Sequence, residues 1–186
     1  MAKVRNQQIR LDFLEKCFNH LVKYGLENAS LRDLCKGTGI SSGSLYYWFG
    51  SKEGLLLEAT QYGLSLVSDN IFQFVFEHIN DPTYFFENFM RHIDTYRMEL
   101  RYIYQVATSP KFGAAMNIQA ISINSNYYNY SRKLCEEYGG SESKIRSIIF
   151  LVASIISDYA VWGDLVVTQE QLDYVRTLLE SELNIK

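Results

Sequence analysis

The sequence predicts an all-α protein, and three observations support this fold class. Apolar residues recur at helical spacing along most of the 186 residues. The chain contains only 2 prolines, so helices can run long without interruption. No segment shows the sustained alternation of apolar and polar residues that is typical of a half-buried strand. A chain of this length can form one domain, or two small ones, around a real hydrophobic core.

The first predicted helix covers about residues 9–24. Its apolar stripe has a residue at every fourth position, namely Ile9, Phe13, Cys17 and Leu21. Gly25 follows, and a glycine in the left-handed conformation commonly ends a helix.

Two short helices follow in close succession. Ser30 is placed to cap the second helix, which ends at 37–39 with two glycines. Ser41 is placed to cap the third helix, over 42–48, and Gly50 to end it.

The fourth predicted helix is long and begins at Lys52. Its apolar residues keep helical spacing as far as the break before Pro82. Four further helices are predicted beyond that break, over 82–104, 111–138, 142–162 and 168–184.

The second and third helices are joined by a tight glycine turn and followed at once by a further helix, which is a helix-turn-helix arrangement. A recognition helix of this kind enters a DNA major groove about 12 Å wide and presents its N-terminal residues to the bases. Ser42, Gly43 and Ser44 are small enough for a close backbone approach. Lys52 and Ser30 each lie at a helix N-terminus, where a DNA phosphate is attracted.

Three consecutive aromatic residues, Tyr46, Tyr47 and Trp48, end the third helix. Successive side chains project about 100° apart, so these three cannot share one helix face. We therefore expect some of them to face the core and others DNA. For any single one, packing between helices is an open alternative.

One run of residues combines the turn, the recognition helix, its aromatic end and the following lysine in register. It comprises Gly25, Ser30, Leu34, Gly39–Ser41, Gly43, Leu45–Phe49 and Lys52–Leu56. Through these residues, 9–57 resemble the DNA-binding domain of the TetR family of bacterial transcriptional repressors. The sequence departs from the family at Cys35 and Thr38 (usually alanine), Trp48 (commonly tyrosine or histidine), and Lys16 and His20 (usually apolar).

The resemblance implies a role for each matched residue. Leu45 and Phe49 would belong to the core of the small domain. Ser44, Tyr46, Trp48 and Lys52 would bind phosphates, whereas Ser42, Gly43 and Tyr47 would face bases. It also implies two domains, a DNA-binding domain over 1–57 and a helical ligand-binding and dimerisation domain over 58–186.

Charge and cysteine content agree with an intracellular DNA-binding protein. Residues 1–60 carry a net charge of +2 and the remainder −5, an asymmetry that accompanies a nucleic-acid-facing end. The 3 cysteines include no CxxC pair and His78 and His92 are far apart, so neither a disulfide framework nor a metal site is predicted. The apolar stretch 145–156 is too short to span a bilayer, so the expected location is the cytoplasm, with no membrane partner.

The helix over 142–162 is apolar nearly all round and must be covered on most sides. A single small core could cover it, and a second subunit does so more naturally, together with the last helix. In the family, two helices from each subunit form a four-helix interface. The predicted homodimer interface therefore contains Ile145, Ile148, Ile149, Val152, Ile156, Leu172, Val175 and Leu179.

The aromatic share is 15%, and the 14 tyrosines concentrate in the middle of the chain. Tyrosines suit a cavity for a flat or apolar ligand with a few polar anchors. The predicted pocket residues are Phe89, Ile93, Tyr96, Met116, Tyr127, Asp158 and Trp162. For each residue taken singly, ordinary core packing is the alternative.

Together with the family resemblance, these features imply a ligand-responsive DNA-binding regulator, a repressor that binds a palindromic operator as a homodimer. The expected effector is an apolar or aromatic small molecule, and no cofactor is predicted. An enzyme is not predicted, because the sequence lacks any Ser/His/Asp, Cys/His, paired-carboxylate or phosphate-loop pattern. The alternatives are a helical small-molecule carrier or sensor that no longer uses DNA, and a structural interaction module.

Overall fold

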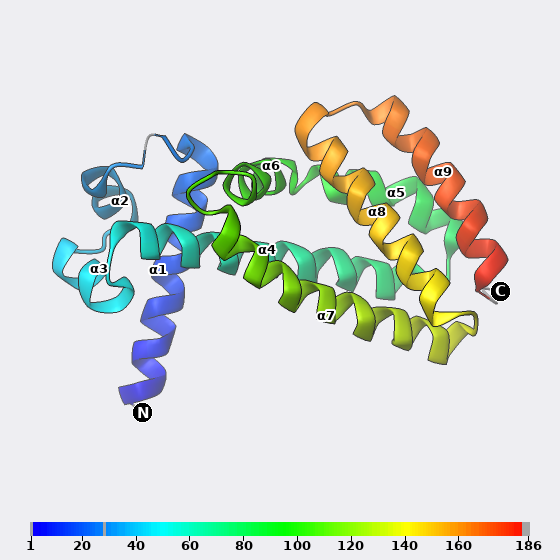
Figure 1. The fold of residues 1–186 in the computed structure, drawn as a ribbon, viewed down its shortest axis with the longest axis horizontal. Helices are drawn as coiled ribbons and strands as arrows, with labels where there is room; N and C mark the ends of the chain where they lie inside the picture. The colour runs from blue at the N-terminus through cyan, green and yellow to red at the C-terminus, as the bar shows by residue number, and fades with distance from the viewer. Residues whose placement is uncertain (1, 28, 184–186) are drawn as a thin grey trace. The chain divides into compact units, whose positions relative to one another are not determined.

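The computed structural model describes residues 2–27 and 29–183, with the backbone alone at 2–5, 82 and 117–126 (Figure 1). The all-α prediction is confirmed, since the described residues form helices and no strand. The helices in chain order are α1 (Ala2–Tyr24), α2 (Leu31–Thr38), α3 (Ser42–Phe49), α4 (Lys52–His78), α5 (Pro82–Asp94), α6 (Arg97–Ala107), α7 (Gly113–Tyr138), α8 (Glu142–Trp162) and α9 (Leu165–Glu182).

The chain divides into two compact units. The first consists of Met1–Val67 and Tyr102–Asn117, and the second of Ser68–Arg101 and Ile118–Lys186. These units do not coincide with the predicted boundary at residue 57, because the first half of α4 and the second half of α6 pack with the N-terminal helices. Tyr102 shows why: its ring lies edge-on to Phe18, at a centroid distance of 6.0 Å, and its hydroxyl lies 3.2 Å from Thr60 Oγ1.

The predicted helix over 82–104 is two helices, α5 and α6. The N–H groups of Thr95 and Tyr96 bond to carbonyls three residues back, those of His92 (3.2 Å) and Ile93 (2.9 Å). Thr95 Oγ1 also donates to the His92 carbonyl at 2.6 Å. These short-range bonds tighten the last turn of α5 and end it. The break contains neither glycine nor proline, so it has no sequence signal.

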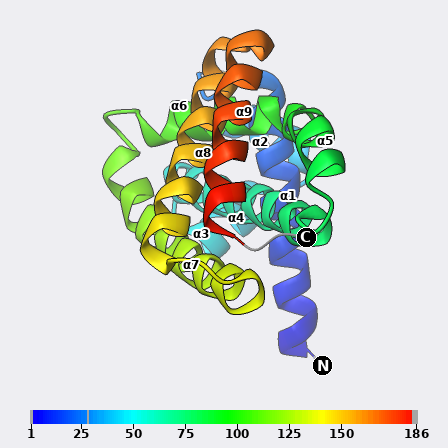
Figure 2. The same cartoon turned by 90° about the vertical axis from the view of Figure 1, so that its right-hand side faces the viewer.

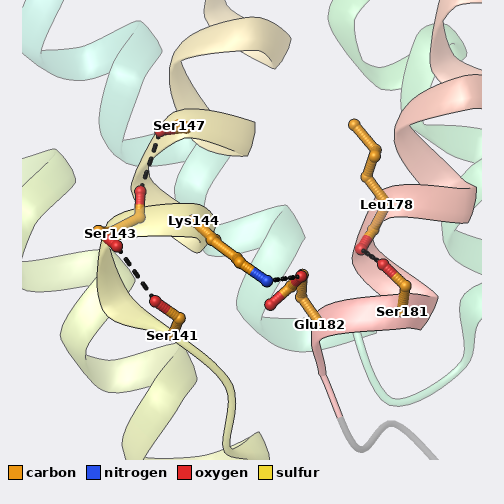
Figure 3. A network of polar contacts seen from close by, with 7 residues as sticks. All are labelled: Ser141, Ser143, Lys144, Ser147, Leu178, Ser181 and Glu182. Atoms are coloured by element: carbon orange, nitrogen blue, oxygen red, sulfur yellow. Dashed lines mark hydrogen bonds and ion pairs between the residues drawn. The ribbon is translucent and has the colours of Figure 1, made fainter.

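In the second unit, α8 and α9 lie side by side (Figures 1 and 2). Gly163, in the left-handed conformation with φ 72°, ends α8, and the carboxylate of Asp164 caps α9 by accepting from two backbone N–H groups at 3.1 Å. Figure 3 shows the other end of the pair, where Lys144 Nζ donates to Glu182 Oε1 at 2.7 Å. Ile145 and Leu172 are among the residues buried in this pair.

By length and composition, α8 could cross a membrane, since an 18-residue window within it has a mean hydropathy of 1.6. The helix is longer than the apolar stretch 145–156 considered from the sequence. Core helices of soluble proteins share these properties, and α8 buries residues such as Ile145 and Ile148 within the chain.

Candidate DNA-binding interface

The start of α2 and its end are both capped as the sequence predicts. Ser30 Oγ accepts a hydrogen bond from the Asp33 N–H at 3.2 Å, and the Ser30 hydroxyl also bonds to the Asp33 carboxylate. Gly39 ends the helix with φ 73°, and its N–H donates to the Cys35 carbonyl at 3.0 Å. Ser30 is exposed, and its predicted phosphate contact stays a prediction.

The last residue of α2, directly before the turn to α3, is a buried threonine, Thr38, where the family usually has alanine. Its hydroxyl donates to the Leu34 carbonyl at 2.7 Å and accepts from the Ile40 N–H at 3.3 Å. Both hydrogen-bonding functions of the hydroxyl are therefore satisfied inside the turn. These two hydrogen bonds connect the last turn of α2 to Ile40, at the start of the connection to α3.

The recognition helix α3 is held by its caps and by two core residues. Ser41 Oγ accepts from the Ser44 N–H at 3.0 Å and lies 2.9 Å from the Ser44 hydroxyl. At the other end Gly50, with φ 70°, donates its N–H to the Tyr46 carbonyl at 3.0 Å. Leu45 and Phe49 are buried, as the resemblance implies.

The outer face of α3 presents small polar residues and tyrosines. Ser42 and Gly43 are exposed, and Ser44 is half-buried. Tyr46 is 52% exposed and Tyr47 is 81% exposed. A Cβ added at Gly43 would meet no protein atom closer than Ser41 Oγ at 3.9 Å. Nothing within the described residues therefore requires glycine at this position.

Trp48 lies between the core and this outer face. It is half-buried, and its indole is edge-on to the ring of Tyr47, with centroids 5.3 Å apart and an interplanar angle of 82°. The three adjacent aromatic residues are thus divided, with Tyr46 and Tyr47 exposed and Trp48 partly covered.

The N-terminus of α4 lies directly after α3. Ser51 Oγ caps it by accepting from the Gly54 N–H at 2.9 Å, and a Cβ at Gly54 would overlap the carbonyl oxygen of Phe49. Lys52 is half-buried and forms no ion pair within the described part of the chain. Its neighbour Glu53 pairs with Lys111 at 2.9 Å, and this bond lowers the pKa of the Glu53 carboxyl. The positive charge of Lys52 is therefore left available to a ligand.

Sequence reasoning did not single out two exposed cations on α2, Arg32 and Lys36. They are four residues apart and so lie on one helix face. Neither forms an ion pair with a residue that the structure describes. Their i,i+4 spacing beside the predicted turn is the signal that could have identified them.

The two unusual residues of α1 have different surroundings, and the Nε2 of one of them, His20, is buried without a hydrogen-bond partner among the described residues. Lys16 is exposed and pairs with Asp12 at 2.8 Å. The His20 ring lies 4.6 Å from the Tyr24 ring and covers Gly37 of α2, where a Cβ would overlap the imidazole. Histidine thus packs α1 against α2 in place of an apolar side chain.

The predicted pocket residues are not gathered around one described cavity. Phe89 and Ile93 are buried in α5, where Phe89 stacks on Phe85 at 5.0 Å. The ring of Tyr96 lies against His92, and that of Tyr127 against Phe72 and Phe150. Met116 is buried in the first unit, whereas the other six belong to the second. Trp162 is 76% exposed.

Two open grooves lie among the described residues of the second unit. One, of about 560 Å³, runs between α8 and α9, and its lining residues are Leu151, Ser154, Ile155, Asp158, Glu170, Gln171 and Tyr174. The other, of about 320 Å³, is lined by Phe76, Lys133, Glu136 and Glu137. Asp158 is the one predicted pocket residue that lines either of these two grooves.

Most of the predicted dimer residues lie inside the chain. Ile145, Ile148, Ile156, Leu172 and Val175 are buried between helices of the second unit, and Ile149, Val152 and Leu179 are half-buried. The reason is that α8 is apolar nearly all round, so helices of the same chain bury one side of it. The apolar residues of α8 and α9 that stay exposed are Phe150, Leu151, Val161, Trp162, Leu165, Val166, Val167 and Tyr174.

His78, His92 and Cys17 take packing positions. His78 and His92 both lie against Phe74, with ring centroids 4.6 and 4.4 Å away. Cys17 is fully buried, and burial raises the pKa of its thiol to about 12. In the described part of the chain, no three His, Cys, Asp or Glu residues are grouped so that they could hold a metal ion.

Comparison with known proteins agrees with this geometry. Residues 15–59 match the family model described as bacterial regulatory proteins, tetR family. The match covers the second part of α1, all of α2 and α3 and the start of α4, which are the elements that build the exposed face of α3. No curated protein matches the chain. The chain therefore carries the N-terminal helix-turn-helix DNA-binding domain of the TetR family of bacterial transcriptional regulators.

Proposed function

We propose that the protein is a homodimeric repressor that binds a palindromic operator and releases it when a small molecule binds to its larger helical region. The observation that supports a DNA interface is the outer face of α3. Tyr47 is 81% exposed there, and nearby Gly43 has open space where a Cβ would lie, so the described residues do not require a glycine. Gly43 then serves a close approach of the helix backbone to the major groove. Ser42 and Tyr47 face the bases.

Phosphate contacts flank this face in the proposed complex. They come from Ser30, Ser44, Tyr46, Lys52 and the two α2 cations, Arg32 and Lys36. Arg32, Lys36 and Lys52 have no ion-pair partner within the described residues, so binding a phosphate breaks no described salt bridge. Charge neutralisation of this kind makes affinity fall with salt concentration.

The proposed dimer uses the exposed apolar face of α8 and α9. Leu151, Val161, Trp162, Val166 and Tyr174 are exposed apolar residues of these two helices, which pack against each other. A two-fold dimer places two recognition helices on half-sites about 34 to 36 Å apart, or a multiple of that distance. The residues proposed here differ from those expected from periodicity, while the helices proposed are the same.

The proposed effector is apolar or aromatic. Support comes from the aromatic side chains of the second unit, including Phe89, Tyr96 and Tyr127, which offer flat apolar surfaces and hydroxyl groups. The effector lowers operator affinity if it binds more tightly to a conformation that does not fit DNA. The part of Met116 in such a site stays a prediction from the sequence.

Selection of duplexes from a random pool by the full chain tests this function. We expect a two-fold symmetric site to be enriched. Lys52→Gln should weaken binding to all duplexes and lower the salt slope by about 1, whereas Tyr47→Ala should change sequence preference. Tyr84→Ala, at an exposed tyrosine of α5, is the matched control. If no duplex is enriched, the carrier alternative stands, and native mass spectrometry for a retained ligand would then support it.

A further inference from the structure

The exposed tyrosine of the recognition helix has one described aromatic contact, with Trp48. The two rings meet edge-on, with centroids 5.3 Å apart and an interplanar angle of 82°. This T-shaped arrangement is one that aromatic pairs favour, because the positive ring edge meets the negative ring face. Tyr47 is otherwise 81% exposed.

One of the two positions next to Tyr47 on the preceding turn of its helix is a glycine. A helical side chain leans over the residue four positions earlier, which for Tyr47 is Gly43. Gly43 has no side chain, and the space at its Cβ position is open. The groove-facing tyrosine is therefore restrained from the Trp48 side, while the glycine leaves room for DNA.

We propose that Trp48 is a positioning residue, whose indole holds the Tyr47 ring in the orientation that contacts the bases. This inference rests on the proposed DNA-binding role of α3. Holding an exposed side chain in its bound orientation reduces the conformational entropy lost on binding. The competing role is a phosphate contact by the indole N–H of Trp48.

The test compares four full-length variants with the unsubstituted protein on the selected duplex and on a scrambled duplex of equal length. Trp48→Phe keeps an aromatic ring without the N–H, Trp48→Leu removes the ring, and Tyr47→Ala is made alone and with Trp48→Leu. We expect Trp48→Phe to keep the sequence preference and the affinity for both duplexes. We expect Trp48→Leu to weaken binding to the selected duplex by about 2- to 10-fold and to leave the scrambled duplex unaffected. In the Tyr47→Ala background, Trp48→Leu should add no further loss.

Two results would overturn the positioning role. One is that Trp48→Phe weakens both duplexes equally while the salt slope stays the same, because the lost indole N–H is an uncharged donor; this result marks a phosphate contact. The other is that the losses from Trp48→Leu and Tyr47→Ala are additive. Thermal unfolding of each variant shows whether a loss of binding comes from misfolding. If Trp48→Leu does not fold, Trp48→Phe still tells whether the aromatic ring or the indole N–H of Trp48 is needed for binding. An unsubstituted protein without sequence preference would instead refute the proposed function.

Discussion

The hydroxyl of Tyr159 in α8 donates a hydrogen bond of 2.5 Å to Asp94 Oδ1, at the end of α5. The guanidinium of Arg97, at the start of α6, lies over the Tyr159 ring at 5.4 Å from its centroid. The same guanidinium occupies the space next to Gly163, where a Cβ would overlap it. The turn between α5 and α6 is thus attached to the C-terminal end of α8 by three side-chain contacts.

We expect Tyr159→Phe to lower the free energy of unfolding by about 1 kcal/mol, since it removes a hydrogen bond from a buried ring and leaves the shape unchanged. Urea unfolding measures this change. Tyr174→Phe is the control, because Tyr174 is exposed on α9. Equal stability of the two variants would show that the Tyr159 hydroxyl contributes nothing.

Stability should fall at alkaline pH because of two buried groups in the first unit. Burial raises the pKa of Cys17 from 9.0 to about 12 and that of Tyr102 from 10.0 to about 12. The folded chain keeps these protons at pH values where the unfolded chain has lost them. The free energy of unfolding is therefore unaffected by these groups below about pH 9. It decreases as the pH rises from about 9 to about 12, by at most about 1.4 kcal/mol per pH unit for each group.

Urea unfolding at a series of pH values checks this slope. Tyr102→Phe and Cys17→Ala should each flatten it, whatever their effect on stability at pH 7. An unchanged slope in both variants would place its origin elsewhere.

Two glycines of the DNA-binding domain should respond differently to alanine. Gly54→Ala should destabilise the domain, because the Cβ would overlap the Phe49 carbonyl oxygen, a backbone atom. Gly43→Ala should keep or raise the melting temperature, since alanine favours the helix and the space is open. If Gly43 serves a close approach to DNA, this stable variant should still lose operator affinity, as gel-shift titration would show. Unchanged affinity would mean that DNA does not approach at Gly43.

Thr38→Val should lower the free energy of unfolding by about 1 to 3 kcal/mol. The valine fills the space of the threonine but leaves the Ile40 N–H, now bonded at 3.3 Å, without its acceptor. Thr38→Ser keeps the hydroxyl and is the matched variant. Chemical unfolding should rank serine above valine, and the reverse order would show that the methyl group matters more than the bond.

The proposed dimer should dissociate when a charge is placed on the exposed face of α8. We expect Trp162→Glu to give a monomer in sedimentation velocity at concentrations where the unsubstituted protein is dimeric, because a buried unpaired carboxylate opposes association. Tyr84→Glu places the same charge on exposed α5 and should leave the dimer intact. A dimer that survives Trp162→Glu would move the interface away from this face.

The caps of the DNA-binding domain could be predicted because they depend on residues close together in sequence. Ser41 caps α3 through the Ser44 N–H, and Gly39 takes the left-handed conformation that ends α2. The break after Asp94 could not be predicted in the same way, because Thr95 ends α5 through its hydroxyl and backbone without glycine or proline.

By itself, the sequence determined most of the helices and the caps of α2 and α3, since these follow from local hydrogen bonding and helical periodicity. Only the tertiary structure decided which side of each apolar helix is covered. Ile145 and Leu151 both lie on α8 and are both apolar, yet packing against neighbouring helices buries Ile145 and leaves Leu151 at the surface. Helical periodicity describes how the side chains of one helix are distributed around its axis. Whether a given side chain is buried depends on which other helices pack against it, and this is set by the tertiary structure.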